Sequence, residues 1–166
     1  MQQFVDAVRQ AIATSNWVSA LTTALALPDI CGWLETPDVK SQKRYEIWFD
    51  TYMLGRYTAH AEHVFLSGAD CYALRCALLH EGSDSTERQR ARQALTQFRF
   101  VVPRPGDTVH CNQVGSLLQL QVDLFCEDIC EGVEEWSKRT LIPGSEPHGR
   151  LSELLTIESL GDTLIL

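Results

Sequence analysis

Apolar residues recur every three to four positions along most of the chain, and this spacing predicts helices. The first helical region is expected from Gln2 to about Ala26, with a break near Ser15. Pro28 is expected to end it, because proline inside a helix removes a hydrogen bond and clashes with the preceding turn. Residues 27–40 are therefore predicted to be irregular.

Three further helices are expected downstream. One runs from Ser41 to about Thr58 and carries mostly aromatic residues on its apolar face. The next follows a turn at 68–70 and runs to Glu81, because Gly82 stands where a helix-ending glycine usually stands. The last covers 123–138. Its buried face is predicted to consist of Phe125, Cys126, Ile129, Val133 and Trp136.

The segment between the third and fourth of these helices predicts β structure. Residues 97–102 form the best strand candidate, which Pro103 ends. Residues 108–111 are expected to return beside it as a hairpin, and 117–122 is either another short strand or already helix. Residues 1–166 are thus predicted to form a single, mainly α domain, a helical bundle with a small β-hairpin insert near 97–112. The apolar tail 151–166 is expected to pack as a last strand or against a partner chain.

The formal net charge of −8 argues against a general nucleic-acid coating protein, which is normally basic. It leaves room for one local basic patch. Five arginines and only Glu87 of opposite charge lie between Thr86 and Arg104, a local net charge of +4. The candidate nucleic-acid-binding residues are Arg88, Arg90, Arg92 and Arg99. A solvated, arginine-rich helix explains the same charges, and both interpretations stay open.

Phe98 and Phe100 alternate with Arg99, a pattern that can stack bases on an exposed strand. The sequence favours the alternative, in which both phenylalanines belong to the core. Acidic residues on the helix at 123–138 recur every three to four positions and are interpreted as a solvated stripe rather than a partner surface.

Six cysteines are present, and neither a secretory signal nor an apolar run long enough for a membrane span is found in the sequence. A cytoplasmic protein with free thiols and no membrane association is therefore expected. Cys126 and Cys130 are spaced to chelate a metal, but no Cys-x2-Cys pair accompanies them. No metal and no other cofactor is expected.

The sharpest chemical signal is Arg75, followed after four residues by His80, at the end of a helix that Gly82 closes. Histidine transfers protons near neutral pH, and arginine can bind a phosphate with two donors and stabilise developing negative charge. RNA cleavage by its own 2′-hydroxyl needs both functions and no metal. Positions five apart lie about 140° apart around an ideal helix. Cooperation between the two residues therefore requires an opened last turn, a partner chain, or both.

The segment Leu74-Arg-Cys-Ala-Leu-Leu-His80-Glu-Gly82 resembles the signature of the HEPN superfamily of helical proteins. The resemblance implies a metal-independent endoribonuclease or RNA-binding protein, with Arg75 and His80 as catalytic residues. It also implies a homodimer with a composite site, and a place in a toxin–antitoxin or phage-defence system with an antitoxin or similar protein as partner.

One residue departs from the family pattern. Many active members carry a polar residue directly after the arginine, whereas this chain has Cys76. Arg75 can equally serve as a salt-bridge residue, and His80 as a cation that the helix C-terminus favours. The alternative function is accordingly a non-catalytic helical module that binds a protein partner.

Overall fold

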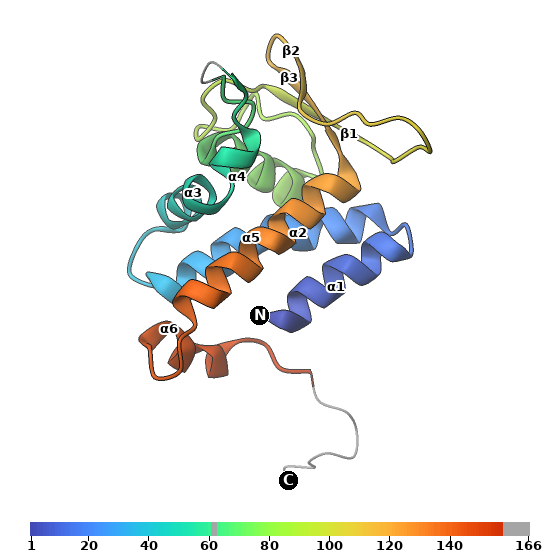
Figure 1. Cartoon of the computed structure of the whole chain (residues 1–166). Coiled ribbons are helices and arrows are strands. Elements are labelled where there is room, and N and C mark those ends of the chain that lie inside the picture. The colour runs from blue at the N-terminus through green and yellow to red at the C-terminus, as the bar shows by residue number, and fades with distance from the viewer. Residues whose placement is uncertain (61–62, 158–166) are drawn as a thin grey trace.

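The computed structural model describes residues 1–60 and 63–157. Its helices are α1 (Gln2–Ala13), α2 (Trp17–Glu35), α3 (Ser41–Tyr52), α4 (Gly68–Cys76), α5 (Val122–Thr140) and α6 (Glu146–Gly149). Its shorter turns are η1 (Leu54–Tyr57), η3 (Ala77–Glu81) and η4 (Arg150–Glu153), and its strands are β1 (Gln97–Val101), β2 (Asn112–Val114) and β3 (Leu117–Gln121). Helices α2 and α5 form the centre, α1 packs against both from one side, the small sheet lies at one end and α6 at the other (Figure 1). The mainly helical prediction is confirmed.

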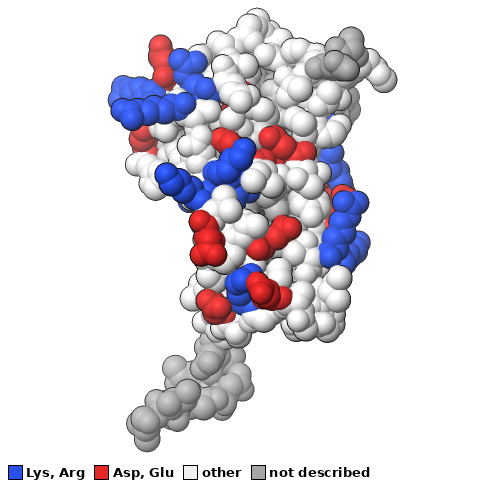
Figure 2. Space-filling view, turned by 90° about the vertical axis from the view of Figure 1, so that its left-hand side faces the viewer, with Lys and Arg blue, Asp and Glu red and all other residues white. Residues whose placement is uncertain are grey.

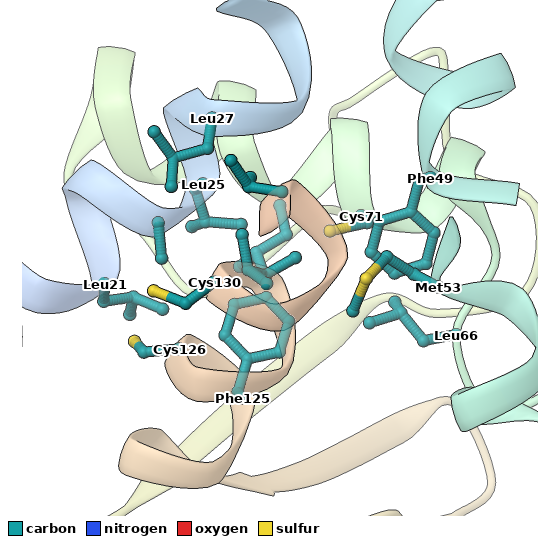
Figure 3. Close-up of a cluster of buried hydrophobic side chains, with 14 of the residues drawn as sticks. Leu21, Leu25, Leu27, Phe49, Met53, Leu66, Cys71, Phe125, Cys126 and Cys130 are labelled. Carbon is teal, nitrogen blue, oxygen red and sulfur yellow. The ribbon is translucent and has the colours of Figure 1, made fainter. Parts of the chain in front are cut away.

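Helix α2 is the central core helix and is apolar nearly all round. It packs against α1, α3, α4 and α5. Leu21, Leu25 and Leu27 of α2 lie in the same apolar cluster as Phe125, Cys126 and Cys130 of α5 (Figure 3). By length and composition α2 could cross a membrane, but half of its most apolar window is buried within the fold. Nine residues of α2 are buried, so the helix belongs to the core of the fold.

Of the two helix boundaries predicted in the first 40 residues, one is confirmed and the other is wrong. The break near Ser15 is confirmed: Ser15 adopts a left-handed φ of 55°, and the Asn16 side chain then caps α2. The predicted end at Pro28 is wrong, because α2 continues to Glu35. An interior proline costs about 3 kcal/mol or more, and burial of apolar residues on both sides of Pro28 offsets this.

The expected turn at 68–70 is also wrong, because these residues form the first turn of α4. Ser67 caps the helix by accepting a hydrogen bond from the Asp70 N–H. Gly68 lies so close to α3 that a Cβ would stand 2.8 Å from the Glu46 carbonyl oxygen. Glycine is therefore needed for close helix packing rather than for a turn.

The sheet has the order β1-β3-β2, with β1 parallel and β2 antiparallel to β3. The predicted hairpin of 97–102 with 108–111 does not form; the hairpin joins β2 to β3, and 102–111 connects β1 to β2. β3 is the central strand of the sheet. Its residues Leu118 and Leu120 are fully buried, as is Phe98 of β1. For 117–122 the strand alternative is confirmed up to Gln121, the last residue of β3. Val122 is already the first residue of α5.

The predicted face of α5 is confirmed, since all five of its residues are fully buried. In the tail, Leu151 and Leu154 pack against the core, whereas Leu155 and Ile157 are exposed. The expected last strand falls largely on 158–166, which lie outside the described residues.

Candidate functional site

The segment that carries Arg75 and His80 changes its winding between the two residues. Arg75 is in the last turn of α4, and the chain then widens into the π-helical turn η3. Gly82 closes this turn with a left-handed φ of 63°, and its N–H donates to the Leu78 carbonyl. A wider turn reduces the angle of about 140° that an ideal helix would place between Arg75 and His80. The opened last turn that cooperation requires is therefore present.

The Arg75 side chain is held at the junction of α2, α3 and α4. Its Nη2 lies 3.3 Å from Asp29 Oδ2, and only 19% of its side chain is exposed. Asp29 also accepts from Arg44 Nε at 2.8 Å and from the Ser41 hydroxyl. Two guanidinium groups thus share one carboxylate, which leaves the three charges with a net +1. The Nε of Arg75 is buried and has no hydrogen-bond partner among residues 1–60 and 63–157.

His80 differs from Arg75 in its surroundings. It is exposed on η3, and within the described part of the chain it makes no hydrogen bond or ion pair through its ring. Glu81, which follows it, accepts a hydrogen bond from Gln89 at 2.9 Å instead of orienting the imidazole. The imidazole of His80 is therefore available to a ligand, whereas the Arg75 guanidinium is already in an ion pair.

The arginine-rich segment is a loop, 83–96, and is anchored to α4 by Asp70. This carboxylate is 3% exposed and accepts backbone N–H groups from Gln93, Ala94 and Leu95 at 2.7, 3.1 and 3.2 Å. Thr86 is fully buried and donates to the Leu95 carbonyl at 2.8 Å. The helical conformation assumed in the alternative interpretation of these arginines does not form, because the buried carboxylate stabilises a non-helical course of the backbone.

The arginines of the predicted nucleic-acid surface are mostly exposed, and few of their N–H donors are bonded within the described residues. Arg88, Arg90 and Arg99 are exposed, and Arg92 donates its Nε to the Glu87 carbonyl. In the two described ranges none of these four forms an ion pair. Of these four, Arg88 lines a polar pocket of about 390 Å³ that reaches the π-helical turn, together with Glu81, Ser83, Ser85 and Glu87.

Basic charge is not continuous over this part of the molecule. Figure 2, which looks onto the side of α3 and α4, shows basic side chains in separate groups with acidic ones between them. Phe98 is fully buried, and Phe100 is half-buried against Phe125 with ring centroids 5.6 Å apart. The core interpretation of Phe98 is confirmed, and neither ring forms an exposed stacking platform on β1.

A second polar cluster was not predicted as a site. His110 Nε2 lies 3.5 Å from Asp128 Oδ2, and the Tyr57 hydroxyl donates to the same oxygen at 2.9 Å. Burial alone lowers the pKa of His110, but Asp128 and the adjacent Cys111 outweigh burial and raise the pKa to about 9. The His110-Cys111 pair was visible in the sequence, but its carboxylate partner is on α5 and only the fold brings them together.

Four cysteines behave as small apolar core residues: Cys31, Cys71, Cys126 and Cys130 are fully buried. All six cysteines are free thiols, as expected. Burial raises the pKa of Cys71 and of Cys130 to about 12 each. Between residues 1 and 157, leaving out 61–62, no group of three or more potential metal ligands occurs.

Comparison with protein-family models, with curated proteins and with solved structures finds no match for this chain.

Proposed function

We propose that this chain is a HEPN-like RNA-binding protein that cleaves RNA without a metal. The observation that carries the proposal is the arrangement of α4: one helix leads to an exposed His80 on a π-helical turn and, through Asp70, anchors the arginine loop. π-Helical turns occur frequently at functional sites. A proton-transfer group and a set of cations that form no ion pair within the described residues therefore belong to one continuous piece of structure.

The chemistry divides between the residues as follows. Arg88, Arg90, Arg92 and Arg99 bind phosphates along a single RNA strand. His80 transfers the proton of the attacking 2′-hydroxyl or of the leaving oxygen. Arg75 keeps unused N–H donors while Asp29 orients it, and its positive charge stabilises the phosphorane-like transition state.

The finer parts of the proposal follow from the same resemblance. The chain works as a homodimer in the cytoplasm, in which two copies of the Arg75 and His80 pair face one cleft. It belongs to a toxin–antitoxin or phage-defence system, and its protein partner is an antitoxin or a similar inhibitor. Free thiols and burial of the apolar α2 are compatible with this compartment.

The enzyme proposal is tested by incubating the purified chain with single-stranded RNA in EDTA. His80→Ala is expected to lower the cleavage rate by about 100-fold or more, the usual contribution of a general acid or base. His148→Ala is the matched control, because His148 is also exposed, in a short helix at the far end of the chain. Equal rates for wild type and His80→Ala would reject catalysis by this residue.

RNA binding is tested separately, by titration at several salt concentrations. Removing two phosphate contacts in an Arg88→Ala, Arg90→Ala double variant should weaken binding and reduce the salt slope by about 1.4, at about 0.7 for each contact to a single strand. The control is the Lys138→Ala, Arg139→Ala double variant. It removes the same charge in the last turn of α5, outside the arginine loop. Equal loss in both variants would mean that only net charge matters.

One observation favours the second candidate, a non-catalytic module that binds a protein partner. Arg75 is bonded within its own chain to Asp29, as a structural salt-bridge residue would be. This second candidate predicts that Arg75→Ala lowers the free energy of unfolding. It also predicts that neither the wild type nor any variant cleaves RNA. A partner copurified with wild type but not with surface variants of α5 would then identify the binding face.

A further inference from the structure

A cavity of about 520 Å³ lies where the parallel strands β1 and β3 end. Their last residues, Val101 and Gln121, are partners in the register, so both carboxyl ends are level. The connection 102–111 leaves the sheet at this end, and its residues from Val102 to Val109 complete the wall. Ligands commonly bind outside the carboxyl ends of parallel strands, and this volume is typical of a small-molecule site. We name this space the strand-end cavity.

Gln121 supplies a buried amide to the strand-end cavity. Only 7% of this residue is exposed. It stands at the N-cap of α5, but its side chain does not cap the helix. Its Oε1 instead accepts the Val109 N–H at 3.3 Å, while its Nε2 donates to no atom of the described residues. The cavity therefore contains a fixed N–H donor that is left for an acceptor on a ligand.

The tight turn at 104–107 places two opposite charges on the same cavity. Gly106 has a φ of 86°, and the Asp107 N–H donates to the Arg104 carbonyl at 3.2 Å, as in a type II turn with proline before glycine. Arg104 and Asp107 form an antiparallel bridge, so their side chains project to one side. Both line the cavity, yet neither forms an ion pair within residues 1–60 and 63–157. Both charges are therefore available to a ligand.

Apolar side chains form much of the remaining wall. Phe100 and Val102 line the cavity on the side of β1, and Val109 lines it on the returning side of the connection. Val102 is 55% exposed although it directly follows β1. An apolar wall with a few placed polar groups is the usual composition of a ligand site. A fitting ligand has an apolar body, an acceptor for the amide, donors for the carboxylate and a negative charge for the guanidinium.

A guanine nucleotide carries these groups together. The O6 of guanine is an acceptor, and its neighbouring N1–H and N2–H groups can both donate to one carboxylate, while the two faces of the ring are apolar. Adenine, cytosine and uracil each present a carboxylate with a single donor group on the same edge. Proteins read unpaired bases through hydrogen bonds to this edge, and a guanidinium binds the attached phosphate.

We propose that the strand-end cavity holds one guanine base of the bound RNA. Gln121 donates to O6, Asp107 accepts the N1–H and N2–H groups, and Arg104 binds the adjoining phosphate. This inference rests on the proposed RNA binding and adds a base preference, which phosphate contacts alone do not provide. Arg99 lies on β1, which ends at the cavity, so the proposed phosphate contacts continue from the arginine loop to the base.

The first measurement titrates the full chain with each of the four nucleoside 5′-monophosphates by calorimetry. GMP is expected to bind at least about tenfold more tightly than AMP, CMP or UMP, because a bidentate contact discriminates between bases to this extent. Asp107→Asn should remove the preference, since an amide replaces one acceptor oxygen with a donor. Asp38→Asn is the matched control, because Asp38 is also exposed, in the turn between α2 and α3.

Arg104→Gln is expected to weaken GMP by about tenfold and to leave guanosine, which has no phosphate, unchanged. Arg104 and Asp107 are exposed on a turn, so both variants should keep the melting temperature of the wild type. Equal affinity for the four nucleotides, or a guanine preference that survives in Asp107→Asn, overturns the proposal.

The second measurement separates RNA from free nucleotide. In the His80→Ala chain, an oligouridine with one central guanosine is expected to bind about tenfold more tightly than oligouridine alone, and GMP should compete with it. The Arg88→Ala, Arg90→Ala double variant should weaken both oligomers and leave GMP unchanged. GMP binding without a difference between the oligomers would assign the cavity to a free nucleotide and overturn its part in RNA binding. Absence of RNA cleavage would reject catalysis by His80 and would leave the GMP titration unaffected.

Discussion

At the scale of single residues, buried charges position the surface that carries the proposed function. Asp70 accepts three backbone N–H groups from the arginine loop and also the Ser67 hydroxyl. Through these hydrogen bonds the Asp70 carboxylate stabilises the course of the loop backbone. Removing it leaves buried donors without partners, which is more costly than losing an exposed bond.

Asp70→Ala is therefore expected to lower the free energy of unfolding by about 2–4 kcal/mol. Urea denaturation measures the change. Asp84→Ala in the same loop is the control, because the Asp84 side chain is exposed, and its backbone carbonyl, which accepts a hydrogen bond from the Phe98 N–H, is kept in the variant. A loss below about 1 kcal/mol for Asp70→Ala would show that the loop holds its course without the carboxylate.

The pair of His110 and Asp128 predicts a pH dependence of stability. The pKa of His110 is raised from 6.5 to about 9, so its contribution is complete below pH 6.5 and is lost as the pH rises towards 9. The pKa of Asp128 is lowered: burial raises it, but hydrogen bonds from His110 and Tyr57 prevail. Its contribution is present above its unfolded pKa and is lost as the pH falls through the folded one.

Thermal or urea unfolding should thus show wild type losing about 2 kcal/mol between pH 6.5 and 9. His110→Gln should be less stable at pH 6 and flatter over this range. A variant curve that keeps the full alkaline slope would assign that slope to other groups.

At the scale of elements, close approach between helices explains positions that local patterns misplace. α3 and α4 pack so closely that Gly68 faces the Glu46 carbonyl oxygen and an Asp50 carboxylate oxygen, with no space for a side chain. The Gly68 N–H also donates to Asp50 Oδ1 at 2.8 Å. The glycine is a contact between helices, and α4 begins there because α3 permits it.

Gly68→Ala should consequently lower the free energy of unfolding by about 1–3 kcal/mol, since the backbone of α3 must move. Gly149→Ala is the matched control: its φ is −59°, and a Cβ there meets nothing within 4 Å. We expect the control to be neutral or slightly stabilising. Equal effects of the two substitutions in chemical denaturation would contradict the packing argument.

At the scale of the whole molecule, we propose that the activity depends on more than one chain. The π-helical turn brings His80 nearer to the face of Arg75, but Arg75 remains paired with Asp29. The dimer of the proposal would add a second Arg75 and a second His80 to the cleft. Net charge does not assist this association, because two chains of −8 repel each other.

Specific ribonuclease activity is thus expected to rise with protein concentration and with moderate salt, over the range in which light scattering detects dimers. An excess of the His80→Ala chain should suppress wild-type activity by forming mixed dimers. Activity that is proportional to wild-type concentration, with or without that excess, would mean that one chain is sufficient.

Local sequence was enough to predict the start of α3, most of α4, the buried face of α5 and the glycine that closes η3, but the predicted end of α3 near Thr58 is wrong, because the helix stops at Tyr52 and the turn η1 follows. Each of the confirmed features depends on residues within one or two helical turns, where apolar spacing and the conformation of Gly82 act directly. Arg75 and His80 were visible as a pair for the same reason, because only four residues separate them.

Tertiary structure decided what lies far apart in the sequence. α2 continues through Pro28 because the surrounding helices bury its apolar residues, and β1 pairs with β3 rather than with the segment that follows it. The ion pair of Arg75 joins residues 46 positions apart, and Asp70 reaches the arginine loop 23 to 25 positions away. Such contacts depend on how helices pack, which no local pattern of residues contains.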